Sequence, residues 1–138
     1  MRQGDPDVES LVREWIEKGE ADLEVARRMA AEAAASVRIR EIVGFHCQQA
    51  AEKYLKAFLT GYQIEFPKTH DIQALLQLVK AAGCPFTDSL GDAKWLTPFG
   101  VEIRYPGEAA EMLPGDEVKA IEIAGRVRQV VLEVLENG

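Results

Sequence analysis

Apolar residues at helical spacing are the feature that most restricts what this chain can fold into. In the segment "GFHCQQAAEKYLKAFL", residues 44–59, apolar side chains recur three and four positions apart, the spacing that gathers them on one face of an α-helix. No segment shows the sustained alternation of apolar and polar residues that indicates a β-strand. The pattern therefore predicts an all-α protein.

Helical spacing, capping residues and glycine or proline breaks divide the chain into five helical segments. Their predicted ranges are 8–35, 40–61, about 70–82, 87–96 and about 114–135. Thr69 or Asp71 caps the third segment, and a short extra turn is expected near 98–103. Long helices joined by connectors of moderate length predict an antiparallel helix bundle. The length of 138 residues suits one domain, placed at 1–138 with its core at about 8–135.

Charge and cysteine content narrow the class of protein. The formal net charge of −7 weighs against nonspecific binding to nucleic acid, although pairs such as Arg27/Arg28 form either a local basic patch or a solvated face. Cys47 and Cys84 are too few for a disulfide framework or a closed zinc site, so we expect reduced thiols and no metal. Because no membrane span or signal peptide is evident, we expect a cytoplasmic protein.

Polar residues gather on one side of the second predicted helix. At about 100° per residue, four of them fall within an arc of roughly 80°: His46, Gln49, Lys53 and Lys56. Such an arc is either a solvated face or a binding face for a phosphate or a partner protein, because lysine binds phosphate as a point charge. Gln48 falls inside the apolar arc instead, so we expect it to be buried and hydrogen-bonded, for example to a helix terminus.

Three motifs follow one another along the chain: "FHCQQAAEKYLKAFL" at 45–59, "THDIQALL" at 69–76 and "RYP" at 104–106. Together with "EWIEKGEADLEVARRM" in the first helix, they resemble the signature of the HEPN family (higher eukaryotes and prokaryotes nucleotide-binding domain). The resemblance implies an all-α, antiparallel up-and-down bundle of four to five helices that commonly forms homodimers. It also implies a partnership with a minimal nucleotidyltransferase, as a toxin–antitoxin or nucleotide-binding pair.

Some branches of the family that this chain resembles are metal-independent ribonucleases, which use an arginine followed four to six residues later by a histidine. Arg40 and His46 have that spacing, but they lie early in the chain whereas the family's pair lies late. Their six-residue offset also separates them by about 120° around a helix. They are weak catalytic candidates, and the sequence favours a non-catalytic branch over an enzyme.

His70, Arg104 and Tyr105 each have a structural and a functional interpretation. His70 stands at a helix start, where it belongs either to a cap and loop network or to a nucleotide pocket. Arg104 can pair with a carboxylate or a helix C-terminus, or it can bind a phosphate while Tyr105 stacks on a base.

The leading hypothesis is a homodimeric nucleotide-binding and regulatory module that partners a minimal nucleotidyltransferase. Its candidate contacts to nucleotide or partner are His46, Gln49, Lys53, Lys56, His70, Arg104 and Tyr105. The first alternative is an RNA endonuclease toxin, with a histidine as general base and an arginine stabilising the pentavalent phosphate. The second is a dimeric scaffold whose polar arc is only an interface. No cofactor is expected apart from a nucleotide ligand such as ATP.

Overall fold

The computed structural model describes residues 5–84, 87–100 and 112–137, and these ranges contain five helices and no β-strand. In chain order they are α1 (Pro6–Ala33), α2 (Val37–Gly61), α3 (Ile72–Ala81), the 3₁₀-helix η1 (Thr87–Gly100) and α4 (Asp116–Asn137). The all-α prediction is confirmed. None of these helices is both long and apolar enough to cross a membrane.

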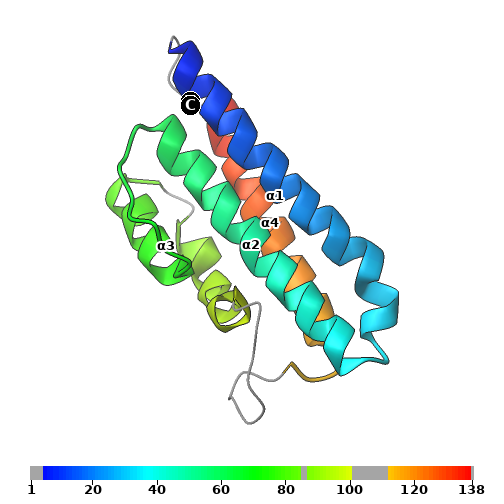
Figure 1. Cartoon of the computed structure of the whole chain (residues 1–138). Coiled ribbons are helices and arrows are strands. Elements are labelled where there is room, and N and C mark those ends of the chain that lie inside the picture. The colour runs from blue at the N-terminus through cyan, green and yellow to red at the C-terminus, as the bar shows by residue number, and fades with distance from the viewer. Residues whose placement is uncertain (1–4, 85–86, 101–111, 138) are drawn as a thin grey trace.

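The helices pack as an up-and-down bundle (Figure 1). A short turn at 34–36 reverses the chain between α1 and α2, so the two long helices lie antiparallel. The shorter α3 and η1 together bring the chain back, and α4 then runs beside α2, so that its C-terminal end lies near the start of α1. The long helices α1, α2 and α4 therefore form the body of the molecule.

The apolar face predicted for α2 forms the centre of the core. Its members are all buried: Cys47, Ala51, Tyr54, Leu55, Phe58 and Leu59. Burial raises the pKa of the Cys47 thiol to about 12, so this free cysteine stays protonated and behaves as a small apolar side chain. Gly19 of α1 lies against the Tyr54 ring, where an added Cβ would come within 3.0 Å of a ring carbon.

The helix starts follow side-chain caps more closely than apolar spacing. Ser36 Oγ accepts a hydrogen bond from the Ile39 amide at 3.3 Å, so α2 begins at Val37 rather than at residue 40. Asp71 caps α3 as predicted, because its carboxylate accepts from the Gln73 amide at 2.9 Å. Gly83 follows α3 with a positive φ of 83°, a conformation in which glycine is favoured at helix ends.

The fourth helical segment differs from its prediction. Residues 87–100 form one continuous 3₁₀-helix rather than an α-helix at 87–96 followed by a new turn. Pro98 lies inside it and has no amide hydrogen to donate. The Thr97 hydroxyl oxygen, one position before Pro98, accepts a hydrogen bond from the Ile72 amide at 3.2 Å. One of the unpaired amides at the start of α3 is thus satisfied from η1.

A polar cluster joins α1, α2 and α4 at the middle of the body. The Tyr54 hydroxyl donates to Glu20 Oε1 at 2.5 Å, and Arg128 Nε donates to the same oxygen at 2.5 Å. The Arg128 hydrogen bond is the main cause that lowers the pKa of Glu20. Burial, aided by the Glu20 hydrogen bond, raises the pKa of Tyr54. The ionised Glu20 carboxylate therefore links three helices.

This cluster predicts a specific pH dependence of stability. Because the folded-state pKa of Glu20 is lowered, its carboxylate stabilises the fold above the ordinary value of 4.5, and that contribution is lost as the pH falls through the folded-state pKa. Glu20→Gln should flatten the acid side of the stability curve in urea unfolding. Since both partners are partly exposed, the effect should stay below about 1 kcal/mol.

Glu24→Gln is the matched control, because Glu24 forms only an exposed pair with Arg28 of the same helix. If the unfolding free energy of Glu20→Gln changed with pH as steeply as that of wild type, the assigned role of Glu20 would be contradicted.

Candidate functional site

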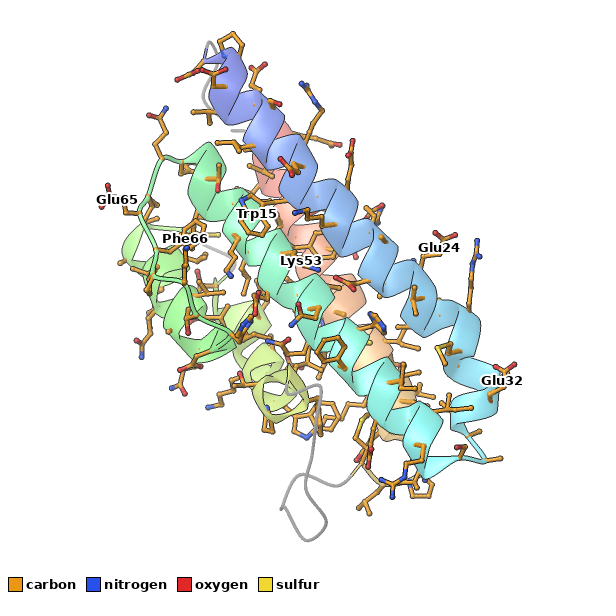
Figure 2. All side chains as sticks on the ribbon, viewed as in Figure 1. Trp15, Glu24, Glu32, Lys53, Glu65 and Phe66 are labelled. Atoms are coloured by element: carbon orange, nitrogen blue, oxygen red, sulfur yellow. The ribbon has the colours of Figure 1, made fainter. Side chains whose placement is uncertain are left out.

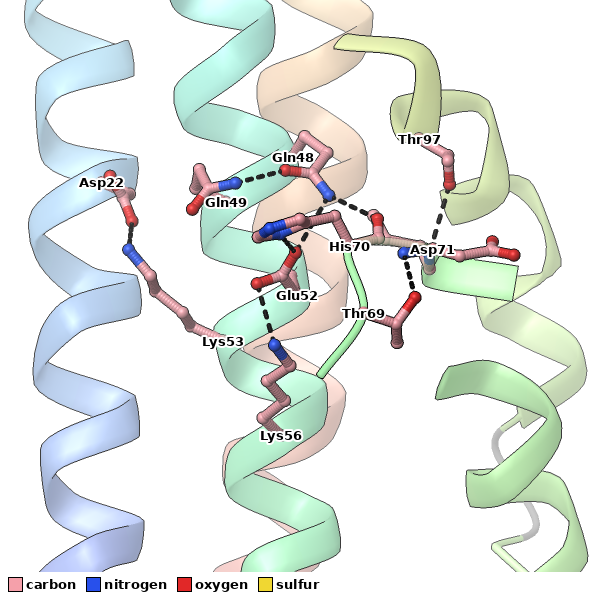
Figure 3. Close-up of polar contacts among 11 residues, drawn as sticks. Asp22, Gln48, Gln49, Glu52, Lys53, Lys56, Thr69, His70, Asp71 and Thr97 are labelled. Carbon is pink, nitrogen blue, oxygen red and sulfur yellow. Dashed lines mark hydrogen bonds and ion pairs between the residues drawn. The ribbon is translucent and has the colours of Figure 1, made fainter. Parts of the chain in front are cut away.

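The polar arc predicted on α2 lies between α1 and the connector of residues 62–71 (Figure 3). We refer to its four members, His46, Gln49, Lys53 and Lys56, as the α2 strip. Three of the four are half-buried, and Lys56 is only 7% exposed. The arc is therefore not a simple solvated face, because groups from α1 and the connector cover part of it.

Asp22 of α1 binds two members of the α2 strip. His46 Nδ1 lies 2.9 Å from Asp22 Oδ1, and Lys53 Nζ lies 2.5 Å from Asp22 Oδ2. An ionised carboxylate only accepts hydrogen bonds, so Nδ1 carries the proton and Nε2 is left as the acceptor of a neutral His46 ring. These contacts hold α1 against α2 and compensate the charge of Lys53.

Glu52 organises the other side of the α2 strip. Its carboxylate is buried and lies 3.1 Å from Lys56 Nζ and 2.7 Å from His70 Nδ1. His70 comes from the connector, and 72% of its side chain is exposed. By the same argument as for His46, Nε2 of a neutral His70 is the ring nitrogen that can accept from a ligand.

The two adjacent glutamines have different surroundings. Gln48 is fully buried and donates to the backbone carbonyl of His70 at 2.9 Å, just ahead of the α3 cap. Gly100 of η1 lies against its amide, since a Cβ there would come within 2.6 Å of Gln48 Cδ. The half-buried Gln49 donates to Gln48 Oε1 at 2.8 Å. The prediction of a structural, hydrogen-bonded Gln48 is confirmed.

Two aromatic rings close one end of the α2 strip, where Figure 2 shows Trp15 and Phe66. Their centroids lie 6.3 Å apart in an edge-to-face arrangement. Lys56 Nζ lies 5.5 Å from the Trp15 ring centre and 5.9 Å from that of Phe66, distances at which rings attract a cation. Lys56 is thus held by Glu52 and two rings. Among the described site residues, those with partly exposed side chains are His46, Gln49, Lys53 and His70.

The sequence-based set of site residues lacked the two carboxylates. Glu52 had a signal, because Gln48 and Lys56 stand four residues before and after it on the same helix. Asp22 had none, since it lies 24 positions from His46 and 31 from Lys53 and looks like one more acidic residue of α1. Charge pairing between helices, rather than spacing within one, completes the site.

A comparison with protein families matches residues 12–136 to the HEPN domain. The chain belongs to the HEPN family. The matched range spans α2, α3 and η1 completely and includes the whole α2 strip with Asp22, Glu52 and His70. The comparisons with curated proteins and with solved structures gave no match.

Arg40 has a structural position in this HEPN domain. Arg40 is 7% exposed, and its guanidinium donates to the carbonyl oxygens of Ala33 at 2.9 Å and Met112 at 3.3 Å. It thereby satisfies a carbonyl at the end of α1 and fixes the chain ahead of α4. His46 binds Asp22 instead, so the two members of the weak catalytic pair are engaged with separate partners.

Two other candidate residues, Arg104 and Tyr105, lie outside the described residues, and their assignment to the binding surface stays a prediction. Within the part of the HEPN domain that the structure describes, no three His, Cys, Asp or Glu side chains are grouped as a metal site requires.

The position of Arg40 predicts a large loss of stability on Arg40→Ala. The substitution leaves buried carbonyl oxygens without donors, which should cost about 2–3 kcal/mol. Arg38→Ala is the control, because Arg38 is highly exposed and pairs only with Glu41 nearby, and it should cost less than about 0.5 kcal/mol. Chemical denaturation measures both, and equal losses would show that Arg40 does not tie the helix ends together.

Proposed function

We propose that this HEPN domain is a nucleotide-binding regulatory module that works beside a minimal nucleotidyltransferase. The observation that carries the proposal is the placement of His46, Lys53 and His70, two imidazoles and one ammonium, along one side of α2. All three have partly exposed side chains, at 26%, 20% and 72% respectively. They are oriented by two less exposed carboxylates, Asp22 at 13% and Glu52 at 4%.

The chemistry of these groups suits a nucleotide. Lysine binds phosphate as a point charge, so Lys53 is the group that would contact a phosphate. The free Nε2 atoms of His46 and His70 can accept hydrogen bonds from ribose hydroxyls or from the amino group of a base. The half-buried amide of Gln49 can donate and accept beside them.

Asp22 should limit the affinity of this surface for phosphate. Its carboxylate already binds both His46 and Lys53, so an incoming phosphate must compete with it and would be repelled by its charge. Removing that charge while keeping the shape of the side chain should therefore strengthen nucleotide binding. This expected gain distinguishes a phosphate-binding role of Lys53 from a purely structural one.

The surroundings of Arg40 support a binding role over catalysis. If Arg40 acted in RNA cleavage, its guanidinium would have to be free to contact the phosphate that is being cleaved. Arg40 is buried and bound to backbone carbonyls, which argues against its pairing with His46 in RNA cleavage.

Calorimetry with ATP tests the nucleotide part of the proposal through opposite effects of two substitutions. Lys53→Ala should weaken ATP binding about fivefold to tenfold, the loss expected for one charged contact. Asp22→Asn should strengthen it about threefold to fivefold, because the competing charge is gone. Lys68→Ala is the control for nonspecific charge, since Lys68 is an exposed connector residue outside the α2 strip.

Absence of heat with millimolar ATP in wild type and in Asp22→Asn would refute nucleotide binding at this surface. Metal-independent RNA cleavage that disappears in His46→Ala would instead favour the endonuclease.

Association with a nucleotidyltransferase and with a second copy is the other part of the proposal. It rests on the family resemblance and on large apolar side chains that are exposed in the described chain: Leu11, Val25, Ile42, Leu113 and Val118. Such side chains can be covered when a partner binds, although singly they are common on protein surfaces.

Co-expression with the product of the neighbouring reading frame tests the partnership. We expect that frame to encode a small nucleotidyltransferase that co-purifies with the tagged HEPN domain, and light scattering to give the mass of a dimer for the domain alone. A neighbouring product of another class, or one that does not co-purify, would contradict the partnership.

A further inference from the structure

A second candidate binding site lies between α3 and η1 and shares no residue with the α2 strip. The two elements line an open hollow of about 210 Å³ at the surface. On the α3 side it is lined by Gln73, Gln77 and Lys80, which are spaced four and three residues apart and therefore share one face of an α-helix. All three are exposed, while the neighbouring Leu76 is buried.

The η1 side of the hollow follows the period of a 3₁₀-helix. Asp88, Gly91 and Lys94 line it, and their spacing of three residues places them above one another, because a 3₁₀-helix has three residues per turn. Gly91 leaves the middle of this row open, since an added Cβ would have no heavy atom within 4 Å.

The two lysines of the hollow lack the partners that most cationic side chains of the described chain have. Most cationic side chains in the described ranges have a partner: Lys18, Arg28, Arg38, Lys53, Lys56, Arg126 and Arg128 pair with carboxylates, Arg40 with carbonyls, and Lys119 with the Trp95 ring. The ammonium groups of Lys80 and Lys94 form no hydrogen bond or ion pair with any described residue. The same holds for the cationic groups of Arg13, Arg27 and Lys68, but Lys80 and Lys94 line one hollow together. Asp88 is the acidic residue among its lining side chains.

We propose that the α3–η1 hollow binds a small phosphate monoester that also carries hydroxyl groups, such as a sugar phosphate. Lys80 and Lys94 supply two ammonium groups for the phosphate. The amides of Gln73 and Gln77 donate further hydrogen bonds, and the Asp88 carboxylate accepts from a hydroxyl. The volume of about 210 Å³ lies below the roughly 300–1,000 Å³ of pockets for larger ligands, so the ligand is a small molecule.

Titration of the ¹⁵N-labelled full chain with ribose 5-phosphate, inorganic phosphate and ribose tests the site. Ribose 5-phosphate should give saturable shifts of amide signals from residues 73–80 and 87–94, and inorganic phosphate should bind more weakly. Ribose should give no saturable shift. The double variant Lys80→Ala/Lys94→Ala should raise the Kd at least about tenfold, as expected for the loss of two charged contacts.

Two further variants distinguish blocking of the hollow from unfolding and from loss of positive charge elsewhere on the surface. Gly91→Leu should abolish binding by filling the hollow while the helical circular dichroism signal is kept, because its side chain enters open space. Lys68→Ala should leave the Kd unchanged. Binding that survives in the double variant, or that is lost in Lys53→Ala, would overturn the assignment to this hollow. Equal Kd values for inorganic phosphate and ribose 5-phosphate would overturn the role of the hydroxyl groups.

Discussion

The buried carboxylate of Glu52 is the interaction on which the candidate site depends. An ionised carboxylate in the interior costs several kcal/mol unless it is paired and hydrogen-bonded, and Glu52 is 3% exposed. Its donors come from three directions. Lys56 extends toward the rings of Trp15 and Phe66, His70 belongs to the connector, and Gln48 is packed against Gly100 of η1. The single charge therefore ties the connector directly to α2 through His70. It also orients Lys56 and Gln48, the two α2 side chains that contact Trp15 of α1 and Gly100 of η1.

Charge compensation gives the α2 strip its chemical character. Asp22 and Glu52 balance Lys53 and Lys56, so the strip presents oriented hydrogen-bonding groups rather than free positive charge. Such a surface selects ligands by geometry, because an unscreened basic patch would attract polyanions of many kinds. Lys80 and Lys94 between α3 and η1 are the opposite case, since neither has a carboxylate partner among the described residues.

Apolar spacing predicted the fold and the buried face of α2 well, because both depend on a repeat that runs within one helix. It did not distinguish η1 from an α-helix. The buried residues Thr87, Leu90, Ala93, Leu96 and Phe99 recur every three positions, a strict period that marks a 3₁₀-helix, but over two turns the same spacing fits an α-helix nearly as well. For the site, His46, Lys53 and Lys56 were found from the helix wheel and His70 from its place at a helix start, whereas Asp22 was not found. Its pairing depends on how α1 is placed against α2, which no local pattern specifies.

The hydrogen bond from the Ile72 amide to Thr97 has a consequence for the order of folding. A helix of ten residues such as α3 is only marginally stable in isolation. One of its first amides finds its partner 25 positions further along the chain. During synthesis on the ribosome, α3 therefore lacks this contact until the end of η1 has emerged. The two short elements complete each other, and we expect α3 and η1 to form together as one unit.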